Sequence, residues 1–139
     1  MSVVIDANLL VVLALDDDRA PLVEAKLREW RSAGETLHAP ALMPYEAASA
    51  LARAVVAGNL PADAIDESWA IVTGVPVRLH PLDVGPDVIA MAQRLGRQSA
   101  YDAPYLVLAQ TLDADLWTLH GPLARNAAGL GHRVRLIAP

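Results

Sequence analysis

The chain has 139 residues, a formal net charge of −5, 54% hydrophobic residues and no cysteine. That length suits one domain with a buried core, and the apolar content excludes a disordered chain. The lack of cysteine excludes disulfides, thiolate metal sites and thiol nucleophiles. An acidic balance does not favour a strong non-specific nucleic-acid binder, although a metal ion and a local basic patch can still attract phosphate.

The first residues do not resemble a signal peptide, because they lack a basic segment and Asp6 interrupts the apolar run. The apolar stretch 9–15 is much shorter than the roughly 20 residues that a membrane-spanning helix needs. We therefore expect a soluble, cytoplasmic protein with no membrane partner.

Short runs rich in β-branched residues alternate with longer apolar segments of helical spacing. Strands are expected at 3–5, 36–39, 75–79, 116–119 and 133–137. Helices are expected at 7–15, 21–30, 42–56, 61–72, 84–95, 103–112 and 123–128. This alternation predicts an α/β fold, a parallel-stranded sheet of about four or five strands with helices on both faces. No repeat or linker interrupts it, so residues 1–139 are expected to form a single domain.

Asp6 directly follows the first expected strand, at the end where open α/β sheets bind ligands. An aspartate at this point can instead be the N-cap of the next helix. Asp102 poses the same question at the start of the helix 103–112, because Ser99 to Asp102 matches a capping box and Pro104 suits a first helical turn. Neither aspartate alone decides between binding and capping.

Glu46 lies within an apolar, alanine-rich helix, where a carboxylate is unfavourable unless it is paired or bound to a metal. The alternatives are a solvated helix face or an ion pair with Arg53. Three carboxylates held close together would repel one another unless a cation lay among them. Mg²⁺ and Mn²⁺ prefer oxygen ligands and can lower the pKa of a bound water and stabilise an attacked phosphate. The three acids together suggest phosphodiester hydrolysis, although periodicity alone does not bring them together.

Four segments resemble the PIN-domain family, and within it the toxins of VapBC-type toxin–antitoxin pairs. They are VVIDAN at 3–8, PYEAASAL at 44–51, SAYDAPYLVLA at 99–109 and LWTLHGPLA at 116–124. The resemblance covers essentially the whole chain and implies a PIN-like fold. It further implies an endoribonuclease that depends on Mg²⁺ or Mn²⁺, forms a homodimer and is held inactive by a cognate antitoxin.

The resemblance also implies residue roles. Asp6, Glu46 and Asp102 match the acidic metal-site positions of the family, and they would be both metal ligands and catalytic residues. Asn8 and Thr118 match polar positions that line or brace the site.

His120 departs from the family pattern, which usually has a fourth acidic residue at this point. Asp113 and Asp115 cannot easily replace it, because they precede the strand 116–119 and are expected at its opposite end. A neutral imidazole can ligate a metal, with more preference for manganese or zinc than for magnesium, or it can hold a water or cap the next helix. The histidine therefore bears on activity more than on fold.

Arg125, Arg133 and Arg135 are candidate phosphate contacts, with solvated surface as the alternative. The main functional hypothesis is metal-dependent RNA cleavage by a toxin. The second is a catalytically impaired PIN domain that serves as a protein-binding module, for which His120 is the reason. A third is a DNA or structure-specific nuclease that uses the same metal chemistry.

Overall fold

Five parallel strands form the centre of the computed structural model, which describes residues 1–81, 83, 85–96 and 102–139. The strands are β1 (Ser2–Ile5), β2 (Thr36–Pro40), β3 (Val77–His80), β4 (Asp115–Thr118) and β5 (Val134–Leu136). Their order across the sheet is β3-β2-β1-β4-β5, and all neighbouring pairs run parallel. The predicted α/β fold with a parallel sheet is confirmed.

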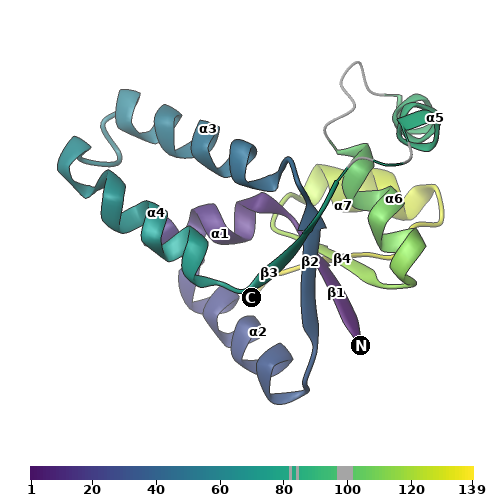
Figure 1. Cartoon of the computed structure of the whole chain (residues 1–139), viewed down its shortest axis with the longest axis horizontal. Helices are drawn as coiled ribbons and strands as arrows, with labels where there is room; N and C mark the ends of the chain where they lie inside the picture. The colour runs from purple at the N-terminus through teal and green to yellow at the C-terminus, as the bar shows by residue number, and fades with distance from the viewer. Residues whose placement is uncertain (82, 84, 97–101) are drawn as a thin grey trace.

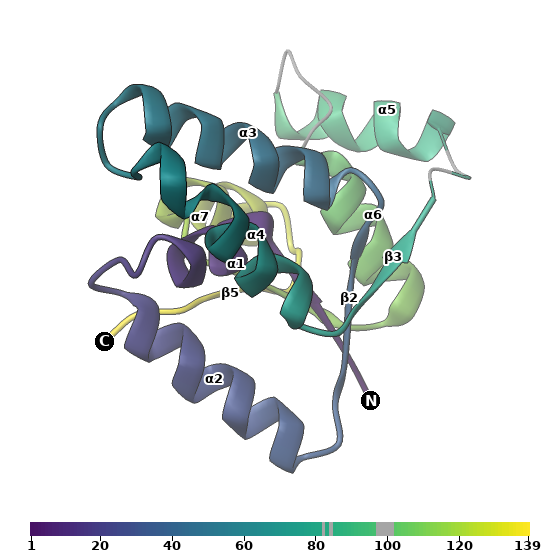
Figure 2. The ribbon, with the colours of Figure 1, turned by 60° about the vertical axis from the view of Figure 1, so that its left-hand side comes forward.

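Helices cover both faces of this sheet, as predicted. Within the described ranges they are α1 (Ala7–Ala14), α2 (Ala20–Ser32), α3 (Met43–Val56), α4 (Ile65–Gly74), α5 (Gly85–Leu95), α6 (Ala103–Leu112) and α7 (Gly121–Gly129). Figure 1 shows α1 to α4 on one side of the strands and α5 to α7 on the other. In the turned view of Figure 2, α3 and α4 run beside α1, in agreement with the contacts among these helices.

Among the boundaries that differ from the prediction, two lie beside prolines. The chain after Pro61 first forms a short 3₁₀ turn (Ala62–Ala64), and the α-helix begins only at Ile65. The third strand begins at Val77 rather than at Val75, because Pro76 lacks the N–H group that a strand ladder needs.

The strand order reverses between β1 and β4. The chain leaves β1 toward β2, whereas it leaves β4 toward β5 on the opposite side. Right-handed crossovers then place the two sets of helices on opposite faces. Open α/β sheets bind ligands at the carboxyl ends of the strands where such a reversal occurs. The residues that follow β1 and β4 are therefore the place to look for a site.

The two central strands are deeply buried, which holds their carboxyl ends in place. Val4, Ile5 and Leu116 are 0% exposed, as expected for parallel strands covered on both faces. β1 and β4 pair in the register Ile5↔Trp117, and the backbone N–H of Asp6 donates to the carbonyl of Trp117 at 3.0 Å. This bond joins the chain just beyond β1 to the end of β4.

No helix among residues 1–81, 83, 85–96 and 102–139 has both the length and the apolar character needed to cross a membrane.

Candidate active site

Asp6 occupies the N-cap position of α1, but its side chain makes no capping hydrogen bond. Its Oδ2 atom instead accepts hydrogen bonds from Thr118 Oγ1 at 2.9 Å and from Asn8 Nδ2 at 3.2 Å. Burial raises the pKa of Asp6, the Thr118 hydrogen bond opposes that increase, and the charge of Asp102 adds to it. The carboxylate therefore faces the end of β4 as well as the start of α1, where hydrogen bonds from the backbone of Ala7 and Asn8 also lower its pKa.

Thr118 and Asn8 form a hydrogen-bond network around Asp6. Thr118 is 0% exposed, and its Oγ1 atom accepts from Asn8 Nδ2 at 3.1 Å and from the backbone N–H of His120 at 3.0 Å. Asn8 Oδ1 accepts from the backbone N–H of Leu119 at 3.2 Å. One hydroxyl thus donates once and accepts twice, which uses its full capacity. The network ties α1 to the end of β4 and restrains the Asp6 side chain.

Glu46 lies in the first turn of α3 and accepts a 2.5 Å hydrogen bond from the hydroxyl of Tyr105 on α6. Burial raises the pKa of Glu46 to about 7; the Tyr105 hydrogen bond lowers it, and the charges of Asp6 and Asp102 raise it. Among the described residues Glu46 forms no ion pair with Arg53. The ion-pair alternative is therefore wrong.

Tyr105 is a site residue that sequence reasoning missed. It is only 2% exposed, and burial, followed by the hydrogen bond to Glu46, raises its pKa. A signal was available in the sequence, because Tyr105 lies three residues after Asp102 and helical residues with that spacing share a face. What the spacing could not reveal is that this face meets α3.

Asp102 occupies the N-cap position of α6, and its side chain makes no capping hydrogen bond either. Ser99, the other end of the expected capping box, lies outside the described residues, whereas Pro104 does lie in the first turn as predicted. The negative charge of Asp102 raises the pKa of both Asp6 and Glu46. Three carboxylates that are far apart in the sequence are thus close enough to repel one another.

His120 is exposed at the N-cap position of α7, and its side chain makes no capping hydrogen bond. The helix-capping alternative is therefore wrong for the imidazole. Arg125 folds back toward the start of the same helix, because a Cβ atom built on Gly121 would lie 2.8 Å from its Nη1 atom. Gly121 comes three residues after the end of β4. The guanidinium therefore lies at the same edge of the sheet as Asp6.

The side chains of Arg133 and Arg135 contact the amino end of β4. Arg133 contacts Asp113 at 2.6 Å and Asp115 at 2.7 Å, and Arg135 contacts Asp115 at 3.4 Å. Both arginines are exposed, so the solvated-surface alternative holds for them. Asp115 begins β4, which confirms that the two aspartates are at the opposite end from Asp6.

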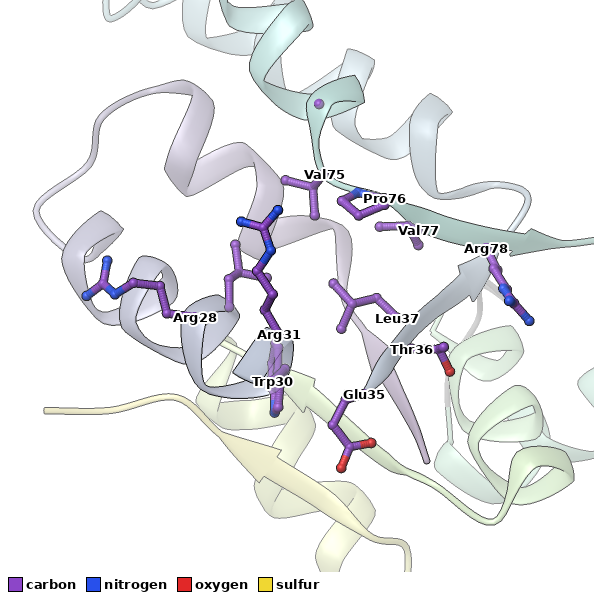
Figure 3. Close-up of a pocket in the computed structure, with 12 residues that line it drawn as sticks. Arg28, Trp30, Arg31, Glu35, Thr36, Leu37, Val75, Pro76, Val77 and Arg78 are labelled. Atoms are coloured by element: carbon purple, nitrogen blue, oxygen red, sulfur yellow. The ribbon is translucent and has the colours of Figure 1, made fainter. Parts of the chain in front are cut away.

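A cavity of about 600 Å³ lies away from this edge, between α2, the start of β2 and the connection from α4 to β3. Figure 3 shows Arg28 and Arg31 on its α2 side, with Leu37, Val75 and Pro76 opposite them. The β2 residues that line the cavity, Thr36 and Leu37, are at the amino-terminal end of that strand, whereas Asp6 follows the carboxyl end of β1. The cavity is therefore not part of the site around Asp6.

The carboxylates of Asp6 and Glu46 are of the ligand type that a hard divalent cation prefers, whereas the Thr118 hydroxyl and the Asn8 amide are engaged in hydrogen bonds within the chain. In the part of the chain that the structure describes, no three acidic, histidine or cysteine side chains form a ready set of metal ligands. Mg²⁺ usually keeps several waters and takes only one or two carboxylates. A hydrated Mg²⁺ would therefore need only one or two of these carboxylates and no closed protein cage.

Comparison with known proteins identifies the family. The chain is 36% identical to the ribonuclease VapC3 of two Mycobacterium tuberculosis strains over 125 residues, which are 88% of this chain and 85% of that protein. The chain belongs to the VapC family of PIN-domain ribonucleases. The predicted family is thereby confirmed.

Two further likenesses span most of this VapC-family chain. It is 28% identical to the ribonuclease VapC3 of Pyrobaculum aerophilum over 134 residues, which are 94% of the chain and 98% of that protein. Its fold is similar to the crystal structure of PAE2754 from Pyrobaculum aerophilum, with a TM-score of 0.68 and 23% identity, covering 91% of this chain and 79% of that one. No family model matches the VapC-family chain.

Proposed function

We propose that the chain is the toxin of a toxin–antitoxin pair, an endoribonuclease that works in the cytoplasm with Mg²⁺ or Mn²⁺. The observation that carries this proposal is that the charge of Asp102 raises the pKa of Asp6 and that both charges raise the pKa of Glu46, beside the reversal of strand order. The relatives that are named ribonucleases support RNA as the substrate.

The proposed roles follow from the contacts at the edge of the sheet. A bound divalent cation would lower the pKa of a water molecule and offset negative charge on the attacked phosphate. Asp6, Glu46 and Asp102 would hold this cation and act as the catalytic carboxylates. Asn8 and Thr118 would keep Asp6 in position through their hydrogen bonds.

Arg125 is proposed as a phosphate contact. Its guanidinium lies against Gly121, three residues after the end of β4, and the side chain is exposed. A guanidinium binds phosphate oxygens well because its donors form a planar fork. It would hold the RNA backbone while the carboxylates hold the ion.

The test is cleavage of total RNA by the purified chain, free of antitoxin, in Mg²⁺, in Mn²⁺ and in chelator. We expect discrete cuts that need metal and that disappear in Asp6→Asn. The control is Asp63→Asn, the same change at an exposed residue of the 3₁₀ turn. Absence of cleavage with every metal would contradict the proposal, and an unchanged rate in Asp6→Asn would remove Asp6 from the mechanism.

A second candidate function is a catalytically impaired PIN domain that binds a protein partner. His120 favours it, because an exposed imidazole stands where the family resemblance expects a fourth acid. The discriminating variant is His120→Asp. A large gain in cleavage with Mg²⁺ would show that the natural site is impaired. Cleavage by the unmodified chain that is much faster with Mn²⁺ than with Mg²⁺ would instead indicate that His120 contacts the metal.

Exposed apolar surface supports the proposed protein partners, an antitoxin and a second copy of the chain. Tyr45 and Val56 on α3 are 79% and 90% exposed. A cleft of about 280 Å³ between α3 and α4 is lined entirely by apolar residues: Ala48, Leu51, Ala52, Val55, Ile65 and Trp69. Apolar surface of this kind is typical of protein-binding sites. Light scattering of the purified chain will show whether it is a dimer.

A further inference from the structure

Tyr45 is an exposed aromatic residue next to an acid of the proposed active site. It is 79% exposed, and in the described ranges its hydroxyl has no hydrogen-bond partner. It directly precedes Glu46 in the first turn of α3. The other described aromatic residues are buried or half-buried: Trp30, Trp69, Tyr105 and Trp117. Neither packing nor hydrogen bonding within the chain therefore explains an aromatic ring at position 45.

Two polar residues continue from Tyr45 along the same side of α3. Ser49 and Arg53 follow at intervals of four residues, and all three side chains are exposed. At about 100° per residue, Ser49 and Arg53 project between the direction of Tyr45 and that of Glu46. At about 1.5 Å per residue, Arg53 lies roughly 12 Å along the helix from Tyr45. These three residues, the α3 stripe, therefore extend from the acidic residues along the side of the helix that carries Glu46.

The apolar cleft between α3 and α4 lies on the other side of the α3 stripe. Its lining residues on α3 are Ala48, Leu51, Ala52 and Val55, and Tyr45 is not among them. By the same helical geometry these residues project away from Glu46. The outer surface of α3 thus has an apolar side next to α4 and, on the side of Glu46, a stripe with an aromatic ring and a cation.

The charge of Arg53 is not neutralised within the part of the chain that the structure describes. It forms no ion pair there, although it is exposed in the last turn of α3. Other described cations do have acidic partners, among them Arg19, Lys26, Arg133 and Arg135. An exposed guanidinium without an acidic partner is suited to a phosphate group. Its distance from Tyr45 corresponds to a few nucleotides of a single strand, at about 3.4 Å for each stacked nucleotide.

We propose that the α3 stripe binds single-stranded RNA beside the cleaved phosphodiester. One nucleobase stacks on the ring of Tyr45, and a phosphate a few nucleotides away binds Arg53. Proteins that bind single strands combine these two elements, an aromatic ring for a base and a cation for the backbone. Bases within a duplex are already stacked on one another, so the Tyr45 contact selects unpaired RNA. This inference rests on the proposed function, because it requires that the neighbouring acids act on RNA.

The experiment measures how the full chain, in chelator, binds a fluorescein-labelled single-stranded RNA that contains the mapped cleavage site. Tyr45→Leu removes the ring and keeps apolar surface, whereas Tyr45→Phe keeps the ring and is the matched control. Both changes are at an exposed residue, so both variants should fold. We expect the Kd from fluorescence anisotropy to rise about tenfold in Tyr45→Leu, because base stacking is lost, and to change less than about twofold in Tyr45→Phe.

Oligonucleotides that each lack one base identify the stacked nucleotide. With the wild-type chain, one abasic position near the cut should weaken binding about tenfold. With Tyr45→Leu the same position should have no further effect, because the ring on which that base stacked is gone.

The cation of the α3 stripe is tested in the same assay. Arg53→Gln should weaken binding about two- to threefold and reduce its salt dependence, because one phosphate contact is lost. The matched control is Arg28→Gln, the same change at an exposed arginine of α2, which should have no effect. Equal effects of these two variants would remove Arg53 from the α3 stripe.

Equal RNA affinities of Tyr45→Leu and Tyr45→Phe would overturn the inference. So would a Tyr45→Leu chain that binds RNA normally but changes its oligomeric state in light scattering, because Tyr45 would then contact a protein. Wild-type chain that neither binds nor cleaves RNA would overturn the proposed function as well. Wild-type chain that cleaves RNA, with Tyr45→Leu unaffected, would overturn this inference alone, so the two failures are distinguishable.

Discussion

The two ends of β4 each carry a cluster of acidic residues, and the clusters differ in what surrounds them. At the amino end, Asp113 and Asp115 lie near the surface and contact Arg133 within 2.7 Å. At the carboxyl end, Asp6 and Glu46 are partly buried, and their hydrogen-bond partners are neutral hydroxyl and amide groups. In the described ranges neither of these two carboxylates has an ion pair.

The difference shows how the same residue type can stabilise a surface or build a site. Exposed ion pairs contribute little to stability. Because each of these aspartates is already paired with an arginine, its charge is not free to bind a ligand. Partly buried carboxylates that repel one another destabilise the metal-free chain, and a bound cation would remove that penalty. The raised pKa values of Asp6 and Glu46 are the mark of this unfavourable arrangement.

The largest expected effect is on RNA cleavage, and it comes from neutralising one acid at each end of β4 in turn. Asp6→Asn should reduce metal-dependent RNA cleavage on the order of 100-fold or more, because it removes a charge that would hold the cation. Asp115→Asn should change cleavage less than about twofold and lower stability by less than about 1 kcal/mol, since it breaks only exposed pairs. Initial cleavage rates and urea unfolding measure both variants. Similar losses of cleavage in the two would contradict the comparison.

The second prediction concerns the network that holds Asp6. Thr118→Val should lower the free energy of unfolding by roughly 1–3 kcal/mol, because the N–H of His120 and the amide of Asn8 lose their buried acceptor. Cleavage should also fall, since Asp6 is no longer restrained. Thr118→Ser keeps the hydroxyl and is the matched control. If Thr118→Val is as stable and active as Thr118→Ser, the network does not position Asp6.

The third prediction uses the raised pKa of Glu46, about 7 against a usual value of 4.5. The folded, metal-free chain binds this proton more tightly than the unfolded chain, so stability should fall as pH rises from about 4.5 to 7. The fall should be roughly 1–2 kcal/mol, less than the full shift would imply, because Glu46 is only partly buried.

Urea unfolding in chelator at several pH values measures this fall. Glu46→Gln should remove most of it, whereas Glu24→Gln, at an exposed residue of α2, should not. Added Mg²⁺ should restore stability at the higher pH, because an ion that binds the folded chain stabilises it. A stability that is flat over this pH range would refute the assigned pKa.

The smallest expected effect concerns Arg125. Gly121→Ala should push the guanidinium away from the start of α7, since the new Cβ would lie 2.8 Å from Nη1. Gly129→Ala is the matched control, because no atom lies within 4 Å of its Cβ position. We expect RNA affinity in chelator, measured by fluorescence anisotropy, to fall about two- to threefold in Gly121→Ala alone, with a weaker dependence on salt. Equal affinities of the two variants would argue against the phosphate contact.

Much of the fold was predictable from local pattern. Buried parallel strands are short β-branched runs, and amphipathic helices repeat every three to four residues, so both are visible in the sequence around Val3 to Ile5 and from Pro21 to Trp30. At two of the boundaries that moved, after Pro61 and at Pro76, the cause was again local. The chemical type of the site was suggested by the three acids together with the family resemblance.

The surroundings of each acid were decided only by the tertiary structure. Asp6 and Asp102 both occupy N-cap positions, and sequence alone could not distinguish capping from binding. The same holds for Arg125, which lies at the site edge, and Arg133, which lies at the opposite end of β4. The strand order β3-β2-β1-β4-β5 and the packing of α3 near α6 determine which side chains these residues contact. The hydrogen bonds of Glu46 and Asp6 join residues that are separated in the sequence by 59 and by 112 positions. Hydrophobic periodicity acts over a few residues, so it determines the elements, whereas long-range packing determines which side chains meet.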